Sequence, residues 1–197
     1  QSVTSGLGND TITLGASTQS VTAGAGDDII VATDALLNGA AMTLDGGLHT
    51  TGDTLRVTDN ASLDDDDFAN MSGIENLVLL GTGAQSIGTI TALGTEAEAV
   101  GIVSIDATAA ALGATIYTFD YATAGITVTT GLGIDDVQTG GGNDTINTGA
   151  GDDYLAGHAG NDTLNGGAGD DILEGGSGAD ALAGGADSDV YWFSAGD

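Results

Sequence analysis

The stretch that decides the fold is residues 130–192, which read TGLGIDDVQ, TGGGNDTIN, TGAGDDYLA, GHAGNDTLN, GGAGDDILE, GGSGADALA and GGADSDVYW. These are seven units of nine residues that follow one another without a gap, and three further units, SGLGNDTIT, LGASTQSVT and AGAGDDIIV, occupy residues 5–31. In the ten units the second position is glycine nine times, the sixth is aspartate nine times, and the eighth is always apolar. A nine-residue period in which glycine, aspartate and an apolar residue each keep a fixed position indicates a repeat architecture.

The pattern also predicts the shape of each unit. Glycines at positions two and four let the backbone turn tightly with positive φ. The apolar residue at position eight is then the inward-pointing middle of a short strand. Each unit makes half a coil, so alternate units stack along opposite edges. We therefore expect an all-β chain that forms a right-handed parallel β-roll or β-solenoid.

Three regions follow from the repeats. Residues 1–31 are N-terminal repeats, residues 32–129 are an irregular β-solenoid segment with loops, and residues 130–197 are a C-terminal β-roll with an aromatic cap of Tyr191, Trp192 and Phe193. The middle region lacks the nine-residue period but contains short β-branched runs: MTL (42–44), TLRV (54–57), ENLVLL (75–80), QSIGTI (85–90), GIVSID (101–106), ATIYTF (114–119) and GITVTT (125–130). Because the pattern starts and stops midway, we expect a segment of a longer protein.

Charge excludes several classes of function. Asp and Glu number 29 against the single basic residue Arg56, which gives a formal charge of −28. Binding nucleic acid needs many Lys and Arg, and an anionic membrane surface would repel this chain. No apolar run is long enough to predict a transmembrane segment. The chain has no cysteine and neither an H-E-x-x-H nor a G-x-S-x-G motif, so we expect no catalytic residues and no enzyme activity.

The repeated aspartates predict metal sites. Stacked coils lie ~4.8 Å apart, and at an effective dielectric near 20 each adjacent pair of carboxylates costs roughly 3 kcal/mol. Carboxylate and carbonyl oxygens from two neighbouring turns suit Ca²⁺, whereas Mg²⁺ demands a tighter octahedron. Calcium is therefore expected to be a folding partner of the chain.

Parity assigns six ions. One C-terminal edge carries Asp135, Asp153, Asp171 and Asp189, which gives three sites, and the other carries Asp144, Asp162 and Asp180, which gives two. Position-five residues that can add oxygens are Asn143, Asp152, Asn161 and Asp170. In the N-terminal repeats Asp10 and Asp28 form one site with Asn9 and Asp27, while the opposite edge has only Gln19 and should be empty. Asp187 replaces a turn glycine in the last unit, which weakens the site there.

Acids in the middle region leave alternatives open. The stretch LDGGLHTTGDTLRV (44–57) resembles a degenerate repeat with Asp53 near position six, so Asp45 and Asp53 could hold another ion. The run Asp64–Asp67 fits either a calcium loop or the first turn of a short helix, where carboxylates favour the positive end of the helix dipole. His49 is expected to be a loop residue.

The consensus G-G-x-G-x-D-x-U-x resembles the RTX, or haemolysin-type, calcium-binding repeat. That resemblance implies folding on extracellular calcium after export by a type I secretion machine. The motif F-x-N-x-S-G-I-E-N-L-V-L-L from Phe68, with the high Thr, Ala and Gly content, is similar to calcium-dependent S-layer proteins. It implies a structural module of a secreted protein on the bacterial cell surface, an S-layer lattice or adhesin that self-associates. The alternative is the C-terminal secretion and folding module of a type I-secreted enzyme or toxin.

Overall fold

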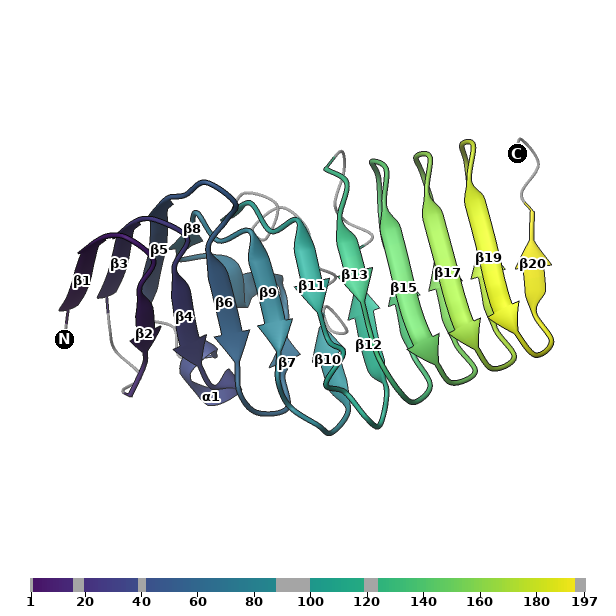
Figure 1. The fold of residues 1–197 in the computed structure, drawn as a ribbon, viewed down its shortest axis with the longest axis horizontal. Helices are drawn as coiled ribbons and strands as arrows, with labels where there is room; N and C mark the ends of the chain where they lie inside the picture. Colours follow the sequence, from purple (N-terminus) through teal and green to yellow (C-terminus); the bar gives the residue numbers. More distant parts are fainter. Residues whose placement is uncertain (1, 16–19, 39–41, 88–99, 119–123, 194–197) are drawn as a thin grey trace.

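The computed structural model describes residues 2–15, 20–38, 42–87, 100–118 and 124–193. The described chain is nearly all β, and every strand pairs in parallel with its neighbours. Figure 1 shows the strands stacked side by side along the long axis of the molecule, with the two termini at opposite ends. This arrangement is the parallel β-roll that the repeats predict.

Three sheets build the solenoid. The nine-stranded sheet contains β2 (Thr11–Thr13), β4 (Ile29–Ala32), β6 (Thr54–Val57), β9 (Asn76–Leu79), β11 (Ser104–Asp106), β13 (Thr127–Thr129), β15 (Thr145–Ala150), β17 (Thr163–Ala168) and β19 (Ala181–Ala186). The seven-stranded sheet contains β7 (Ser62–Leu63), β10 (Gln85–Ile87), β12 (Ala114–Tyr117), β14 (Asp136–Gln138), β16 (Tyr154–Ala156), β18 (Ile172–Glu174) and β20 (Val190–Trp192). The four-stranded sheet contains β1 (Ser2–Leu7), β3 (Ser20–Ala25), β5 (Thr43–Leu48) and β8 (Met71–Ser72).

Strand register follows the parity of the repeat units. Leu155 of β16 pairs with Leu173 of β18, and Ile146 of β15 pairs with Leu164 of β17. In the C-terminal repeats, units of one parity therefore lie in the seven-stranded sheet and units of the other in the nine-stranded sheet, whereas in the N-terminal repeats Val21 lies in the four-stranded sheet. Eight of the ten position-eight side chains are buried in the core between the sheets, while Leu182 is partly buried and Tyr191 is exposed at the end of the stack; the buried ones are Ile12, Val21, Ile30, Val137, Ile146, Leu155, Leu164 and Leu173.

The middle region continues this stack with coils of uneven length. Each β run expected there contains a strand, although residues 88–90 and 119 lie outside the described residues. Three short elements were not predicted: β7 and β8, which have two residues each, and the four-residue helix α1 (Asp34–Leu37). Among the described residues no helix is long and apolar enough to cross a membrane.

The aromatic residues near residue 192 lie at the end of the stack. Tyr191 pairs with Leu173 and so stands over the last buried position of its sheet. Its hydroxyl accepts a hydrogen bond from the Gly184 amide at 2.8 Å. Tyr191 is 38% exposed, Trp192 54% and Phe193 74%, so Tyr191 is the most covered of the three cap residues.

Candidate calcium ladders

The aspartates at position six form hydrogen-bonded rows that we call the inner ladders. On one edge the amide of Asp135 donates to Asp153 Oδ1 at 2.8 Å, Asp153 to Asp171 Oδ1 at 2.9 Å, and Asp171 to Asp189 Oδ1 at 3.2 Å. The structure thus joins these four residues by three hydrogen bonds between successive turns.

The other predicted rows form in the same way. The amide of Asp144 donates to Asp162 Oδ1 at 2.8 Å, and that of Asp162 donates to Asp180 Oδ1 at 2.9 Å. In the N-terminal repeats the amide of Asp10 donates to Asp28 Oδ1 at 2.8 Å. Gln19, on the edge expected to be empty, lies outside the described residues.

The second carboxylate oxygen is buried and unsatisfied in several of these aspartates, but not in Asp135, whose Oδ2 accepts a hydrogen bond from the Thr130 hydroxyl at 2.5 Å. Within the described part of the chain, Oδ2 has no hydrogen-bond partner in Asp28, Asp53, Asp144, Asp153, Asp162 and Asp171. A buried polar atom without a partner costs about 1–3 kcal/mol, and more when it is charged. Each of these oxygens is therefore a coordination position that requires a proton or a cation.

In the last four units position one is glycine, which keeps space beside the aspartate oxygen, whereas the units of Asp135, Asp144 and Asp153 have threonine there. A Cβ on Gly157 would collide with Asp162 Oδ2, and it would lie 2.9 Å from the carbonyl oxygen of Gly175 in the next coil. Gly166 stands in the same relation to Asp171 Oδ2 and the carbonyl of Gly184. Because each of these glycines has no side chain, it leaves a space that is bordered by oxygens from two neighbouring turns.

Burial makes the charged form of these carboxylates unfavourable. Desolvation raises the pKa of Asp135 and of Asp162 from 3.8 to about 6. It also raises the pKa values of Asp144, Asp153 and Asp171. Hard, anionic, unpaired oxygens contributed by two turns fit Ca²⁺, which accepts six to eight oxygen ligands in flexible geometry.

Position-five side chains form a separate, outer ladder on the surface, and here the hydrogen bonds run in the opposite direction. The side chain of the earlier coil accepts from the backbone amide of the later coil at 2.8–3.0 Å; the acceptors are Asn9, Asn143, Asp152, Asn161 and Asp170. Asp27 differs because its carboxylate accepts from the amides of Thr50 and Thr51, and these bonds lower its pKa. The structure places all six predicted residues beside the turns, with one oxygen already used by the backbone.

The inner ladder continues beyond the N-terminal repeats into the middle region. The amide of Asp28 donates to Asp53 Oδ1, and that of Asp53 donates to Glu75 Oε2, both at 2.7 Å. The partners are 25 and 22 residues apart instead of 18, so a strict nine-residue period does not reach Glu75, although the degenerate repeat of residues 44–57 places Asp53 near position six. A local signal was present, because Asp53 and Glu75 each directly precede a strand, as do Asp10 and Asp28.

Two acidic features of the middle region resolve differently. Asp45 accepts a hydrogen bond from the Ser72 hydroxyl at 3.1 Å, whereas Asp53 lies between Asp28 and Glu75. The run from Asp64 forms the 3₁₀ turn η1 (Asp65–Phe68), in which the Asp64 and Asp67 side chains make a reciprocal capping box. The helical interpretation of this run is therefore confirmed, with Asp64 as the N-cap.

One position in the same kind of row carries a neutral amide. Gln85 is buried, and its Oε1 accepts from the Ala61 amide at 2.7 Å, as the aspartates do from the preceding coil. Its Nε2 donates to the carbonyl of Gly81 at 2.8 Å and to that of Gly83 at 3.3 Å. Both polar atoms of this side chain are satisfied, so this turn needs no cation.

Comparison with known families agrees with the geometry. The sequence model of the RTX calcium-binding nonapeptide repeat (4 copies) matches residues 4–34, 129–164 and 156–191. No curated protein and no solved structure matches the chain. The matched segments contain the inner ladders of Asp10 and Asp28 and of residues 135–189, and proteins with such repeats are typically secreted. The chain therefore carries RTX calcium-binding repeats, folded as a parallel β-roll.

Proposed function

We propose that this chain is a calcium-dependent structural module of a secreted bacterial surface protein, an S-layer lattice or an adhesin, which folds and assembles in extracellular calcium. The observation that carries the calcium part is the row of buried Oδ2 atoms without partners in the inner ladders. The proposed role of the ion is to neutralise that row and so to join successive coils. Metal binding to a site that exists only in the folded state adds its free energy to folding.

Export fits the same physics. In calcium-poor cytosol the formal charge of −28 opposes compaction, which suits passage through a type I secretion machine in an unfolded state. Calcium outside the cell would then complete the ladders. Folding would follow secretion for this reason.

The structural role is supported by the middle region. The motif that begins at Phe68 contributes its apolar residues to the solenoid core: Phe68, Ile74, Leu77 and Leu79 are buried. The motif therefore lengthens the same stack by adding irregular coils between the two repeat blocks. A long, continuous β-solenoid with acidic turns suits assembly into a surface array, in which calcium would bridge subunits that otherwise repel each other.

Electron microscopy of the calcium-loaded chain tests this proposal. Ordered two-dimensional sheets that disperse on chelation are the result expected for a lattice. Dispersed particles at all calcium concentrations would contradict the lattice and would favour either an adhesin or the folding module of a type I-secreted enzyme or toxin. The matched variant is Asp152→Ala/Asp170→Ala, which removes two exposed acids from the outer ladder. If its circular dichroism in calcium is unchanged, a loss of sheets in this variant reports lost contacts between molecules and not lost folding.

A further inference from the structure

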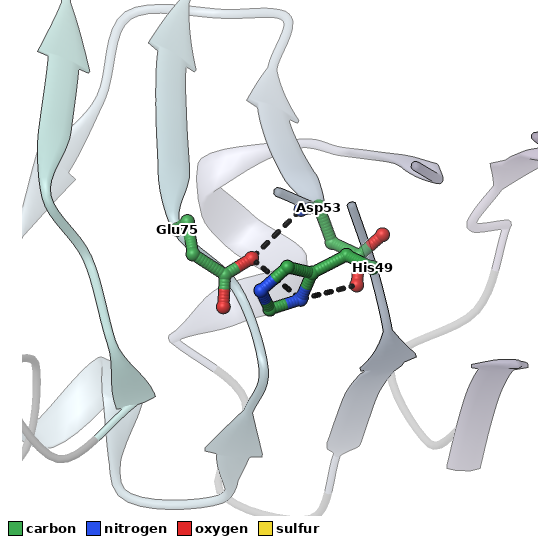
Figure 2. Close-up of side chains that lie close together, drawn as sticks. All are labelled: His49, Asp53 and Glu75. Carbon is green, nitrogen blue, oxygen red and sulfur yellow. Dashed lines mark hydrogen bonds and ion pairs between the residues drawn. The ribbon is translucent and has the colours of Figure 1, made fainter. Parts of the chain in front are cut away.

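The inner ladder of the N-terminal half ends in a group of three side chains that differs from the repeats. Figure 2 shows His49, Asp53 and Glu75 converging on one point from two successive turns. His49 Nδ1 lies 3.2 Å from Glu75 Oε2 and 3.6 Å from Asp53 Oδ2. The three ligand atoms all lie within 4.8 Å of one another.

Asp53 supplies an independent sign that a ligand belongs here. Its side chain is fully buried, and within the described residues its Oδ2 has no hydrogen-bond partner. That oxygen faces the imidazole, while Oδ1 is already used by the Asp28 amide. An acceptor held in this way, without a donor, is suited to coordinate a cation.

We propose that His49 Nδ1, Asp53 Oδ2 and Glu75 Oε2 bind a divalent transition-metal ion of the Zn²⁺ class, separate from the calcium sites of the repeats. Imidazole nitrogen suits zinc and related ions, while calcium is bound by oxygen ligands. For ligands ~2.1 Å from a tetrahedral ion the ligand atoms are ~3.4 Å apart, and the two distances from His49 lie close to that value.

The loop that carries His49 is held in place by hydrogen bonds to the preceding coil. Strand β5 ends at Leu48, which pairs with Ala25 of the preceding coil, so His49 follows where that coil has Gly26. Thr50 and Thr51 then donate four side-chain and backbone groups to the Asp27 carboxylate at 2.8–3.0 Å. These bonds fix the loop before a metal arrives, which is the arrangement that favours tight binding.

Access and charge also fit a bound ion. The side chain of His49 is 34% exposed and that of Glu75 16% exposed, so the group opens to solvent on one side. Three protein ligands leave a fourth tetrahedral position for water. Two carboxylates with a neutral imidazole carry a charge of −2, which a divalent ion balances. The ion would join the coil of Asp53 to the coil of Glu75, where the coils become irregular.

The test is a Zn²⁺ titration of the full chain in saturating millimolar calcium, followed by competition with a chromophoric chelator. We expect one zinc per chain and at least ~100-fold weaker binding in His49→Gln, because loss of a mere outer-shell partner already costs 10–100-fold. His158→Asn, which removes the other imidazole at a turn position with φ 65° that Asn tolerates, should bind zinc normally. Equal binding by His49→Gln, or one-for-one displacement of zinc by calcium, would overturn the proposal.

A second readout needs no variant at the site. Histidine NMR spectra of the unmodified chain should show the resonances of one imidazole shifting on addition of Zn²⁺, and His158→Asn identifies that imidazole as His49. Shifts of neither ring would mean that His49 serves only as an ion-pair partner of the two acids. Equal shifts of both rings would mean non-specific binding, and either result would contradict the site.

Discussion

The turn closed by Gln85 and the turns closed by aspartate use the same backbone hydrogen bond and differ in one atom. Oε1 of Gln85 and Oδ1 of Asp153 each accept from an amide of the preceding coil. The second polar atom of Gln85 donates to turn carbonyls, whereas Oδ2 of Asp153 is buried without a partner in the described structure. The hydrogen bond to the first side-chain oxygen therefore joins successive coils in both kinds of turn. The unpaired second oxygen makes the aspartate turns depend on a cation.

The largest expected effect comes from breaking an acidic edge. The double change Asp153→Ala/Asp171→Ala removes two ligand carboxylates and leaves the buried amides of Asp135 and Asp153 without acceptors. We expect the calcium-loaded chain to lose about 2–6 kcal/mol of unfolding free energy, measured by urea denaturation, and the calcium midpoint to rise.

The matched control for that change is Asp152→Ala/Asp170→Ala, which removes the same charge from the exposed outer ladder. A much smaller shift in midpoint is expected there. If the two double variants behaved alike, the distinction between inner and outer ladders would be wrong.

Acid should partly replace calcium. The pKa values of Asp135 and Asp162 rise from 3.8 to about 6 in the folded chain because of burial. Folding therefore takes up protons, and their stabilising contribution is complete below about pH 4 and is lost as the pH rises through about 6. Chelated protein should gain β circular dichroism on acidification from pH 7 to pH 4, and an unchanged spectrum over that range would contradict the buried position of these acids.

A smaller effect is expected when the Gln85 turn is made acidic. Gln85→Glu keeps the acceptor for the Ala61 amide but removes the donor to Gly81 and Gly83. Without calcium the variant should lose about 1–3 kcal/mol of unfolding free energy, and added calcium should restore more of this loss than it adds to the parent chain. Equal calcium responses of the two chains would show that turn carbonyls do not contribute to cation binding.

The smallest effect concerns a turn residue. Asp187 has φ 79°, a left-handed conformation, where most repeats have glycine. A side chain in this region costs roughly 1–2 kcal/mol, which is partly offset because glycine loses more entropy on folding. Asp187→Gly should therefore raise the thermal midpoint in calcium slightly, by less than about 1 kcal/mol in free energy, and a lower midpoint would assign Asp187 a binding role.

The sequence was sufficient wherever the period is regular. The apolar column from Val137 to Leu173 and the links among Asp135, Asp153 and Asp171 follow from parity alone, because every coil there has the same length. Where coils vary in length, spacing alone does not give the register: a degenerate repeat places Asp53 near position six, but the alignment of Glu75 and Gln85 is visible only in three dimensions. The sequence predicts only a loop residue at His49 for the same reason. Its neighbours in space are Asp53, which precedes the next strand of its own coil, and Glu75 of the following coil.

The central claim is that a cation neutralises the buried Oδ2 atoms of the inner ladders and thereby permits the roll to fold. Its most direct test is the titration of calcium into chelator-treated protein, followed by far-ultraviolet circular dichroism at neutral pH. We predict a cooperative rise in β signal at roughly 10⁻⁴–10⁻³ M calcium, the range of extracellular modules. A chain that already shows its full β signal in chelator, and does not change on addition of calcium, would contradict the claim.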